Sequence, residues 1–161
     1  MASAPTFVPI ATYTIPSSTA SYTFNSIPQT YTDLYIVDNT KQASGSDRVD
    51  LIFNGDTGSS YSVNWLFTST SAIAASNGTV GSSAAYTSRA DTTKGLGYTH
   101  ILGYKDTDKY KLVLSKGSDA SYAVMWTSTW RSTAAITSIT VRPISNFVAG
   151  STITIYGIKA A

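Results

Sequence analysis

The stretch that decides the fold class is Thr152-Ile153-Thr154-Ile155-Tyr156, close to the C-terminus. Its two isoleucines alternate strictly with residues that carry hydroxyl groups, so one face of an extended segment is apolar and the other is polar. The same alternation recurs in segment 139–142 and around Thr23. Threonine and isoleucine are β-branched and favour strands over helices. These segments therefore predict half-buried β-strands.

The preference for strands extends over the whole chain. Serine and threonine occur 24 times each among 161 residues, and both weaken helices because their side chains compete for backbone hydrogen bonds. No segment keeps an apolar stripe with helical spacing for three turns. Turn sequences such as Pro16-Ser17-Ser18 and Lys116-Gly117-Ser118 separate short apolar segments. We expect strands near residues 8–15, 20–25, 33–39, 48–54, 61–68, 96–104, 109–115, 121–130, 136–142 and 151–158.

Eight to ten short strands with this spacing predict an antiparallel β-sandwich or a barrel with almost no helix. The length fits a single domain, 1–161. A C-terminal strand placed inside a sheet, and not at its edge, would protect unpaired backbone groups. One segment, 69–93, is rich in Ser, Ala and Gly and poor in large apolar residues. We expect a long excursion from the sandwich there, since long loops tend to be functional or mobile.

The composition argues against several classes of protein. There is no cysteine, so neither disulfides nor thiolate metal sites can form. The formal net charge is +2 and the basic residues are scattered, whereas nucleic-acid binding needs clustered Lys and Arg. The first ten residues lack the basic start of a secretory signal, and no apolar run approaches the roughly 20 residues that span a bilayer. We expect a protein made in a cytoplasm, with no nucleic-acid or membrane partner.

The shortage of charge points to assembly. Charged residues make up 12% of the chain, about half of the usual share. Interface cores are depleted in Lys and Glu and enriched in Tyr and Trp, and this chain has 11 tyrosines. The densest run of charges, 105–111, mixes both signs and is typical of a solvated turn. We predict a homotrimer, because closed cyclic assembly uses repeated copies of one surface.

Candidate catalytic residues are few. The single histidine, His100, is expected on a strand with polar surroundings. As a general base it would need a nucleophile and an orienting acid nearby. A lone histidine without cysteine also argues against transition-metal binding. We predict no enzymatic activity, no cofactor, and no catalytic, cofactor-binding or metal-binding residue.

The segment Asp56-Thr57-Gly58-Ser59-Ser60 resembles the active-site loop of pepsin-like aspartic proteases. Those enzymes need two carboxylates that share one proton, and this chain has one such motif. A retroviral-type dimer would supply a second Asp, but that family has a hydrophobic residue directly before the Asp, where this chain has Asn54-Gly55. Asn-Gly is the strongest short signal for a hairpin turn. We favour the hairpin turn over a protease dimer.

Two further motifs are also interpreted as turns. Asn54, Asp56 and Gly58 begin like a calcium-binding loop, but the EF-hand pattern requires a closing Glu and the chain contains no Glu. Asn77-Gly78-Thr79 fits the N-glycosylation sequon. Without a signal peptide this sequon has no route to the modifying enzymes.

Aromatic side chains are the remaining candidates for ligand binding. Trp65, Trp126 and Trp130, together with Tyr98 and Tyr104, could form a platform on which sugars stack. Trp126 and Trp130 are an even number of residues apart, so on one strand both indoles lie on the same face. The alternative is that these rings fill the core of the sandwich or a subunit contact, because aromatics supply much of the buried area. We favour the core or a subunit contact.

Three ordered segments resemble small virion structural proteins of tailed phages. They are Ile27-Pro28-Gln29-Thr30-Tyr31-Thr32-Asp33-Leu34, then Asn54-Gly55-Asp56-Thr57-Gly58-Ser59-Ser60-Tyr61, and a C-terminal pattern of Trp130, Thr133-Ala134-Ala135-Ile136-Thr137-Ser138-Ile139, Asn146-Phe147-Val148-Ala149-Gly150-Ser151 and Tyr156-Gly157-Ile158-Lys159. With their flanks the matches reach from about residue 8 to residue 159. The resemblance implies a jelly-roll sandwich and a location on the outer surface of a phage particle.

The resemblance implies one of two functions. Members of this family look like capsid decoration or cement proteins in some phages, and like tail or fibre components in others. We expect the first, a homotrimer that binds the major capsid protein or other virion subunits and stabilises the head shell. The alternative is a tail or fibre component that binds host-surface glycans. The segment 69–93 follows no pattern of the family, and we expect it at the periphery or at the docking face.

Overall fold

The computed structural model describes residues 6–69 and 73–159, and of residues 76–80 the backbone only. The described residues form β-strands, turns and loops and contain no helix. The strands are β1 (Phe7–Thr14), β2 (Tyr22–Phe24), β3 (Asp33–Thr40), β4 (Asp47–Phe53), β5 (Tyr61–Ser69), β6 (Ile73–Ser82), β7 (Ala85–Ala90), β8 (Gly95–Leu102), β9 (Lys111–Ser118), β10 (Tyr122–Trp130), β11 (Ile139–Pro143) and β12 (Thr152–Ile158). The predicted all-β class is confirmed, although twelve described strands exceed the expected eight to ten.

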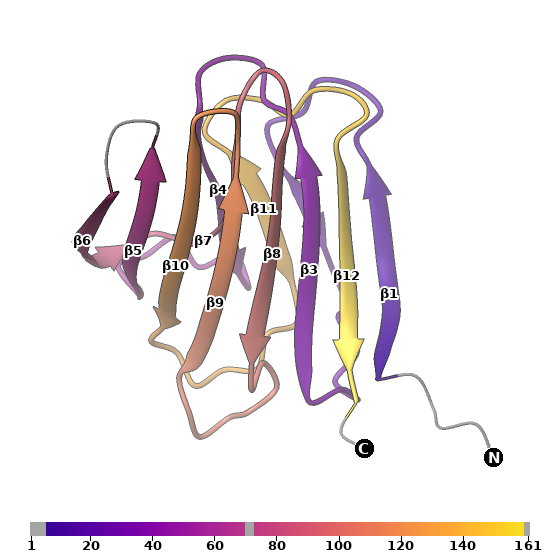
Figure 1. Ribbon diagram of the computed structural model, residues 1–161. Helices are drawn as coiled ribbons and strands as arrows, with labels where there is room; N and C mark the ends of the chain where they lie inside the picture. Colours follow the sequence, from indigo (N-terminus) through magenta and orange to yellow (C-terminus); the bar gives the residue numbers. More distant parts are fainter. Residues whose placement is uncertain (1–5, 70–72, 160–161) are drawn as a thin grey trace.

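The strands form two antiparallel sheets that pack against each other (Figure 1). The long sheet has the order β1-β12-β3-β8-β9-β10-β5-β6, and the small sheet has the order β2-β11-β4-β7. Four antiparallel pairs, β1 with β12, β2 with β11, β3 with β8 and β4 with β7, alternate between the two sheets. This is the winding of a jelly roll, as predicted. The C-terminal strand β12 lies between β1 and β3, inside the sheet as expected.

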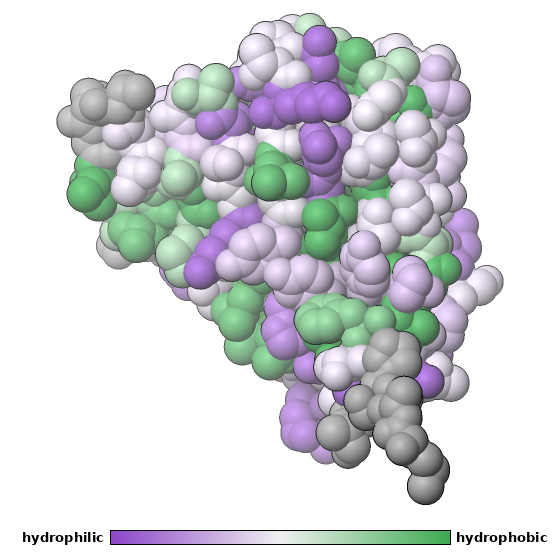
Figure 2. Space-filling view, turned by 45° about the vertical axis from the view of Figure 1, so that its right-hand side comes forward, coloured by the Kyte–Doolittle hydropathy of each residue, from purple (hydrophilic) through white to green (hydrophobic). Residues whose placement is uncertain are grey.

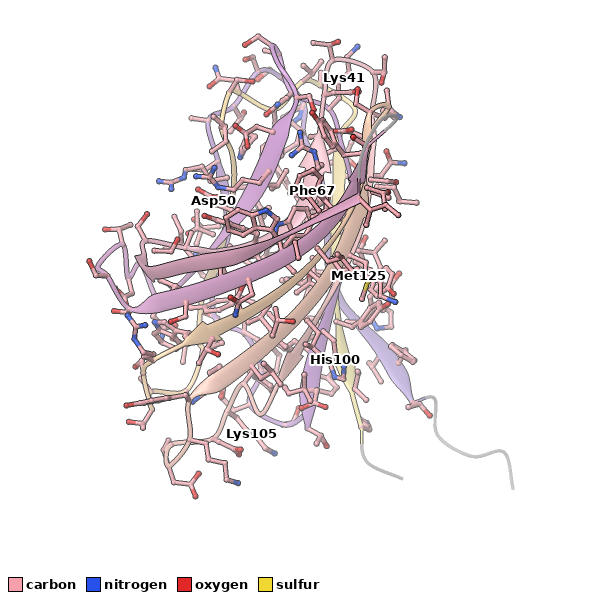
Figure 3. All side chains as sticks on the ribbon, turned by 60° about the vertical axis from the view of Figure 1, so that its left-hand side comes forward. Lys41, Asp50, Phe67, His100, Lys105 and Met125 are labelled. Atoms are coloured by element: carbon pink, nitrogen blue, oxygen red, sulfur yellow. The ribbon has the colours of Figure 1, made fainter. Side chains whose placement is uncertain are left out.

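Two insertions extend the long sheet beyond the jelly roll. β5 and β6 are inserted between β4 and β7, whereas β9 and β10 are inserted between β8 and β11. Together they form the half β9-β10-β5-β6, which we call the extension. Figure 3 shows that the strands of the extension are strongly curved. The small sheet ends at β7, so the inner face of the extension has no full second layer.

The expected excursion at 69–93 contains two strands. β6 pairs with β5 at the edge of the long sheet, and β7 pairs with β4 at the edge of the small sheet. Residues 70–72 lie outside the described part of the chain. From residue 84 to residue 88 every side chain is buried, so β7 shows no apolar–polar alternation. Its buried residues include polar Thr87 and Ser88 beside Ala85 and Tyr86, a mixture that is also typical of a loop.

The main core fills the space between the jelly-roll half of the long sheet and the small sheet. Ile153 and Ile155 are fully buried, as their alternation predicted, and they pack with Leu34 and Ile36 of the neighbouring strand β3. Phe53 contributes from the small sheet and is also fully buried. Full burial of such a side chain is worth about 1.5–3 kcal/mol. The core therefore accounts for the alternating strands found in the sequence.

Strand β7 approaches the long sheet very closely. A Cβ atom on Gly95 would lie 1.7 Å from the Arg89 carbonyl oxygen, and one on Gly97 would lie 2.3 Å from the Ser88 Cβ. Gly117 on β9 has the same constraint, with the Ser88 Cα 2.8 Å from its missing Cβ. Glycines inside strands commonly mark such close backbone approaches. This contact separates the main core from the interior of the extension.

A buried polar network fills the interface between β7 and the long sheet. Asp38 is fully buried and accepts hydrogen bonds from Thr87, at 2.8 Å, and from Ser88. Thr99 donates to Ser115 at 2.9 Å, and Ser115 donates to the carbonyl of Tyr86 at 2.7 Å. Burial raises the pKa of Asp38, against the opposing effect of its hydroxyl partners. The network ties β7 to three strands of the long sheet.

Candidate functional site

A second apolar cluster lies on the inner face of the extension, apart from the main core. Trp65 and Trp126 are direct cross-strand partners on β5 and β10, and Phe67 faces Val124 two positions further along. Tyr86 of β7 packs against Trp126 edge to face, with the ring centroids 6.4 Å apart. The buried members are Val63, Tyr86, Val124 and Trp126, and the partly buried members are Trp65, Phe67 and Tyr122. The gradient from buried to half-exposed marks the wall of a cleft.

This cleft, which we call the aromatic cleft, has a volume of about 330 Å³. It runs between the edge of the small sheet and the inner face of β5 and β10. Its lining residues are Asp47, Arg48, Trp65, Phe67, Tyr86, Arg89, Tyr122, Val124 and Trp126. Figure 3 shows Phe67 on the side of the curved strands where Asp50 of the small sheet also lies. The volume lies at the lower end of the range of about 300–1,000 Å³ that is usual for small-molecule sites.

Two arginines stand opposite each other at the rim of the cleft. Arg48 of β4 and Arg89 of β7 are direct cross-strand partners. The Arg48 guanidinium lies 4.7 Å from the centroid of the Tyr86 ring, and the Arg89 guanidinium lies 4.3 Å from that of Tyr122. Both distances are within the range of cation–π attraction. The rings therefore hold the guanidinium planes against the aromatic walls.

Carboxylates neutralise this arginine pair. Arg48 donates to Asp50 at 3.1 Å and also lies 3.6 Å from Asp47. Arg89 donates to Asp119 at 2.9 Å, and its second nitrogen donates to the Ser46 hydroxyl at 2.7 Å. These pairs fix the direction of each guanidinium.

Asp119 holds one wall of the cleft in place. Its carboxylate accepts the backbone amides of Ser121, at 2.8 Å, and Tyr122, at 2.9 Å, in addition to Arg89. Burial acts to raise the pKa of Asp119, but the hydrogen bonds from Ser46 and Ser121 together with Arg89 outweigh it, and the pKa lies below its ordinary value. The ionised form of Asp119 therefore joins the β9–β10 turn to β7.

A second surface of interest is the outer face of the long sheet. Tyr98, Lys116, Met125 and Leu66 are successive cross-strand partners on β8, β9, β10 and β5. Tyr35 stacks on Tyr98, with the ring centroids 5.6 Å apart. The large apolar side chains of this face are between 37% and 57% exposed, and they are Leu66, Leu96, Tyr98, Leu112, Leu114 and Met125. We call this group the outer apolar face.

The outer apolar face is uneven. One hollow of about 350 Å³ is lined by Leu66, Leu96, Tyr98 and Met125 among others, and a second of about 280 Å³ includes Tyr35 and Leu114. Figure 2 shows apolar patches interspersed with polar side chains on this side of the molecule. In Figure 3, Met125 points away from the side that carries Phe67. The two surfaces therefore lie on opposite faces of the same strands.

The structure divides the proposed aromatic platform. Trp65 and Trp126 meet at the aromatic cleft, but Trp130 and Tyr104 are 2% and 0% exposed within the main core. Tyr98 lies on the outer apolar face. The predicted common face of Trp126 and Trp130 is confirmed, since both point inward from β10.

No motif in the sequence marks the arginines of the cleft. Arg48 and Arg89 are separated by 40 other residues, and the residues around each of them form no pattern typical of a binding site. Only the pairing of β4 with β7 brings the two side chains together. To find them from the sequence, one would have to predict which residue of β4 pairs with which residue of β7.

His100 lies on β8, on the same face as Tyr35. Its Nε2 is 3.1 Å from the Asp33 carboxylate, whose other oxygen accepts the amide of Gly103 at 2.8 Å. The histidine therefore pairs with an acid that is itself held by the backbone. This pair braces the end of β8 against β3.

The Asn54-Gly55 turn is not a hairpin turn, contrary to the prediction. Both residues have positive φ, and the Asp56 amide donates to the Phe53 carbonyl at 2.9 Å, which is the geometry of a type I′ turn. The strands on either side, β4 and β5, belong to different sheets. The turn therefore carries the chain from the small sheet into the extension.

The Asp56 carboxylate has a structural contact. One oxygen accepts the Trp130 indole N–H at 2.8 Å, and the other accepts the Gly58 amide at 2.9 Å. The hydrogen bond from Trp130 is the largest cause of the lowered pKa of Asp56.

Asn54 reaches across to the segment 135–138, where its side chain makes hydrogen bonds to the backbone of Ala135, Thr137 and Ser138. Two of the segments that resemble virion proteins are thus joined by one side chain.

The remaining sequence motifs lie apart from the aromatic cleft. The described residues contain no group of three or more His, Cys, Asp or Glu side chains that could hold a metal ion. The backbone of residues 77–79 lies in β6, and not in the predicted turn. The charged run 105–111 is mostly exposed, but Lys111 is fully buried and its ammonium donates to the carbonyls of Asp106 and Lys109. Burial lowers the pKa of Lys111.

Comparisons with known proteins leave the family open. Among the described residues, no helix is long and apolar enough to cross a membrane. No protein-family model matches the chain, and no curated protein matches it. The similarity to virion proteins of tailed phages therefore stays a prediction.

Proposed function

We propose that the chain is a structural protein of a tailed-phage particle that attaches to neighbouring virion subunits through its outer apolar face. In this proposal it decorates or cements the capsid, and its action is mechanical. Contact area spread over several neighbours raises the force needed to separate them. The resemblance of three sequence segments to virion proteins motivates the location, and the outer apolar face supplies the means of attachment.

The observation that carries the proposal is a row of cross-strand partners on the outer face of four adjacent strands, apolar except for Lys116. From β5 to β8, Leu66 lies next to Met125, Met125 next to Lys116, and Lys116 next to Tyr98. Leu114 lies on β9 beside this row. Large apolar side chains that stay partly exposed together on one face commonly mark protein contacts. A specific contact of this kind buries on the order of 1,000 Å² or more.

The test places one negative charge in the middle of the outer apolar face. Met125→Glu is expected to weaken attachment strongly, because a charged side chain replaces apolar contact surface and pairing with the neighbouring Lys116 does not restore that surface. Ser17→Glu is the matched control, since it adds the same charge at an exposed position in the loop between β1 and β2, outside the outer apolar face. Sedimentation of the purified chains and reconstruction of the particle report the result.

The outcomes separate the two forms of attachment. A trimer that Met125→Glu dissociates would identify the face as a contact between copies of this chain. A trimer that persists while Met125→Glu is lost from particles would identify it as a contact with shell subunits. Unchanged assembly and unchanged particle occupancy would contradict the proposal. Finding the chain only on the tail would favour the alternative, a tail or fibre component.

A further inference from the structure

We propose that the aromatic cleft is a binding site for a neutral saccharide. The site goes beyond the proposed function, because it lies on the face opposite to the outer apolar face. Attachment to a virion through that face would leave the aromatic cleft open to solvent.

The walls of the aromatic cleft match the apolar surface of a sugar ring. Trp65, Phe67 and Tyr122 are all partly buried, and their exposed parts line one continuous space with the buried Trp126. A pyranose ring presents a face of C–H groups, which packs against an aromatic ring while its hydroxyls remain free at the edge. Tryptophan and tyrosine suit such a site because each combines a large apolar body with a polar edge.

The polar groups at the rim match the hydroxyls of a sugar. The Arg48 guanidinium offers several N–H donors in a fixed plane, and the neighbouring Asp47 carboxylate is an acceptor that is 43% exposed. Donor and acceptor side by side can bind two adjacent hydroxyls, one as acceptor and one as donor. Arg48 is already oriented by Asp50 and by the Tyr86 ring, so little further ordering is needed on binding.

The charge balance of the aromatic cleft indicates that the sugar is neutral. Arg48, Arg89 and the nearby Arg142 are paired with Asp47, Asp50 and Asp119, so three positive charges meet three negative charges. An acidic sugar would have to compete with these carboxylates for the guanidinium groups. A neutral sugar needs only the guanidinium N–H groups that are not used in these ion pairs.

The arginine pair places guanidinium donors at the rim of the cleft despite their mutual repulsion. Like charges directly opposite each other on neighbouring strands are destabilising, and Arg48 and Arg89 occupy such a position. Three carboxylates and two aromatic rings offset the repulsion. A purely structural strand pair could avoid the repulsion with uncharged residues.

The experiment titrates the full chain with neutral sugars and follows saturation-transfer NMR and tryptophan fluorescence. The probes are the methyl glycosides of glucose, galactose and mannose, lactose and maltose, with glucuronic acid and glucosamine as charged counterparts. We expect at least one neutral sugar to bind. Trp65→Ala should weaken that binding by about tenfold or more through loss of the stacking surface. Tyr98→Ala, which removes a ring from the opposite face of the same sheet, should change it by less than about twofold.

Arg48→Lys tests the polar rim separately from the aromatic wall. The substitution keeps the charge but loses the planar donor fork, so binding of the same sugar should weaken while the thermal midpoint changes little. Tyr122→Ala replaces Trp65→Ala if the latter does not fold.

Three results would overturn the proposal. They are no binding of any neutral sugar at millimolar concentration, a preference for the charged sugars, or equal losses of binding in Trp65→Ala and Tyr98→Ala. None of these results bears on attachment through Met125, so the two proposals fail independently.

Discussion

The jelly-roll half of the long sheet and the extension are built from the same kind of strand but use their inner faces differently. Opposite the small sheet, the inner residues are aliphatic and fully buried, as at Leu34, Ile36 and Ile155. In the extension the inner face carries several aromatic rings, which are graded from buried Trp126 to partly buried Trp65. The difference arises because the small sheet ends at β7 and covers only part of the extension.

This contrast shows how one sheet can be stable and also offer a binding surface. The covered half can use apolar burial for stability, because the small sheet packs over its inner face. The extension keeps its order through the polar network around Asp38 and through Asp119, which hold β7 and the β9–β10 turn. Its aromatic side chains are thereby positioned without being fully buried.

The largest expected effect contrasts a phenylalanine of the main core with one of the aromatic cleft. Phe53→Ala should destabilise the fold by about 3–5 kcal/mol, because it leaves a cavity beside Tyr61 and Trp130 in the main core. Phe67→Ala should cost about 1 kcal/mol or less, because the ring is already partly exposed in the aromatic cleft. Urea unfolding followed by circular dichroism measures both. Similar losses in the two variants would contradict the contrast.

The close approach of β7 gives the next effect. Gly97→Ala should cost roughly 2–3 kcal/mol, because the new Cβ meets Ser88 at 2.3 Å and the backbone must shift. Gly45→Ala is the control, since its Cβ meets nothing within 4 Å and the cost comes only from a positive φ of 73°. Thermal unfolding should therefore rank Gly97→Ala as the more damaging. The reverse order would show that β7 can move away from the long sheet.

Two carboxyl groups should respond to pH with opposite signs. The pKa of Asp38 is raised by burial, so the stability that its neutral form contributes is present at low pH and lost as pH rises through the folded-state pKa. An asparagine at position 38 cannot ionise, so Asp38→Asn avoids the loss of stability at high pH. The variant should raise the thermal midpoint by a few degrees at about pH 8 and change it little at acid pH. Hydroxyl partners can both donate and accept, so the amide keeps its hydrogen bonds.

Asp119 in the extension is the counterpart with a lowered pKa. Its ionised form contributes stability above the unfolded-state pKa, and that stability is lost as pH falls through the folded-state pKa. Asp119→Asn should therefore lower the thermal midpoint near neutral pH and have less effect in acid. Midpoints measured from acid to mildly alkaline pH test both variants. A shift of the same sign for Asp38→Asn and Asp119→Asn near neutral pH would refute this assignment.

The smallest effect is expected at the turn that joins the small sheet to the extension. Asp56→Asn should lower the stability by about 1 kcal/mol, because an amide oxygen can still accept the Trp130 indole N–H while the hydrogen bond from the Gly58 amide is lost. Tryptophan fluorescence and urea unfolding measure the change. The same variant tests the protease alternative, since peptide hydrolysis that disappears with Asp56→Asn would overturn the structural role of this loop.

The sequence alone determined the strands whose two faces differ. Ile153 and Ile155 have one buried face and one polar face, and period-two alternation arises from that local fact. It could not reveal β7, because that strand is buried on both sides and its residues show no alternation of apolar and polar side chains. Asn54-Gly55 predicts a turn correctly but not the role of that turn, since turn conformation is local whereas the pairing of the flanking strands is not.

Only the tertiary structure decided the aromatic cleft. Arg48, Arg89 and Tyr122 come from three strands, and their contacts depend on the register of β4 with β7 and on the approach of β7 to the long sheet. The aromatic residues were visible in the sequence, but which of them is buried depends on where the small sheet ends. Local patterns report the two faces of a strand, whereas burial is set by what a distant segment places against each face.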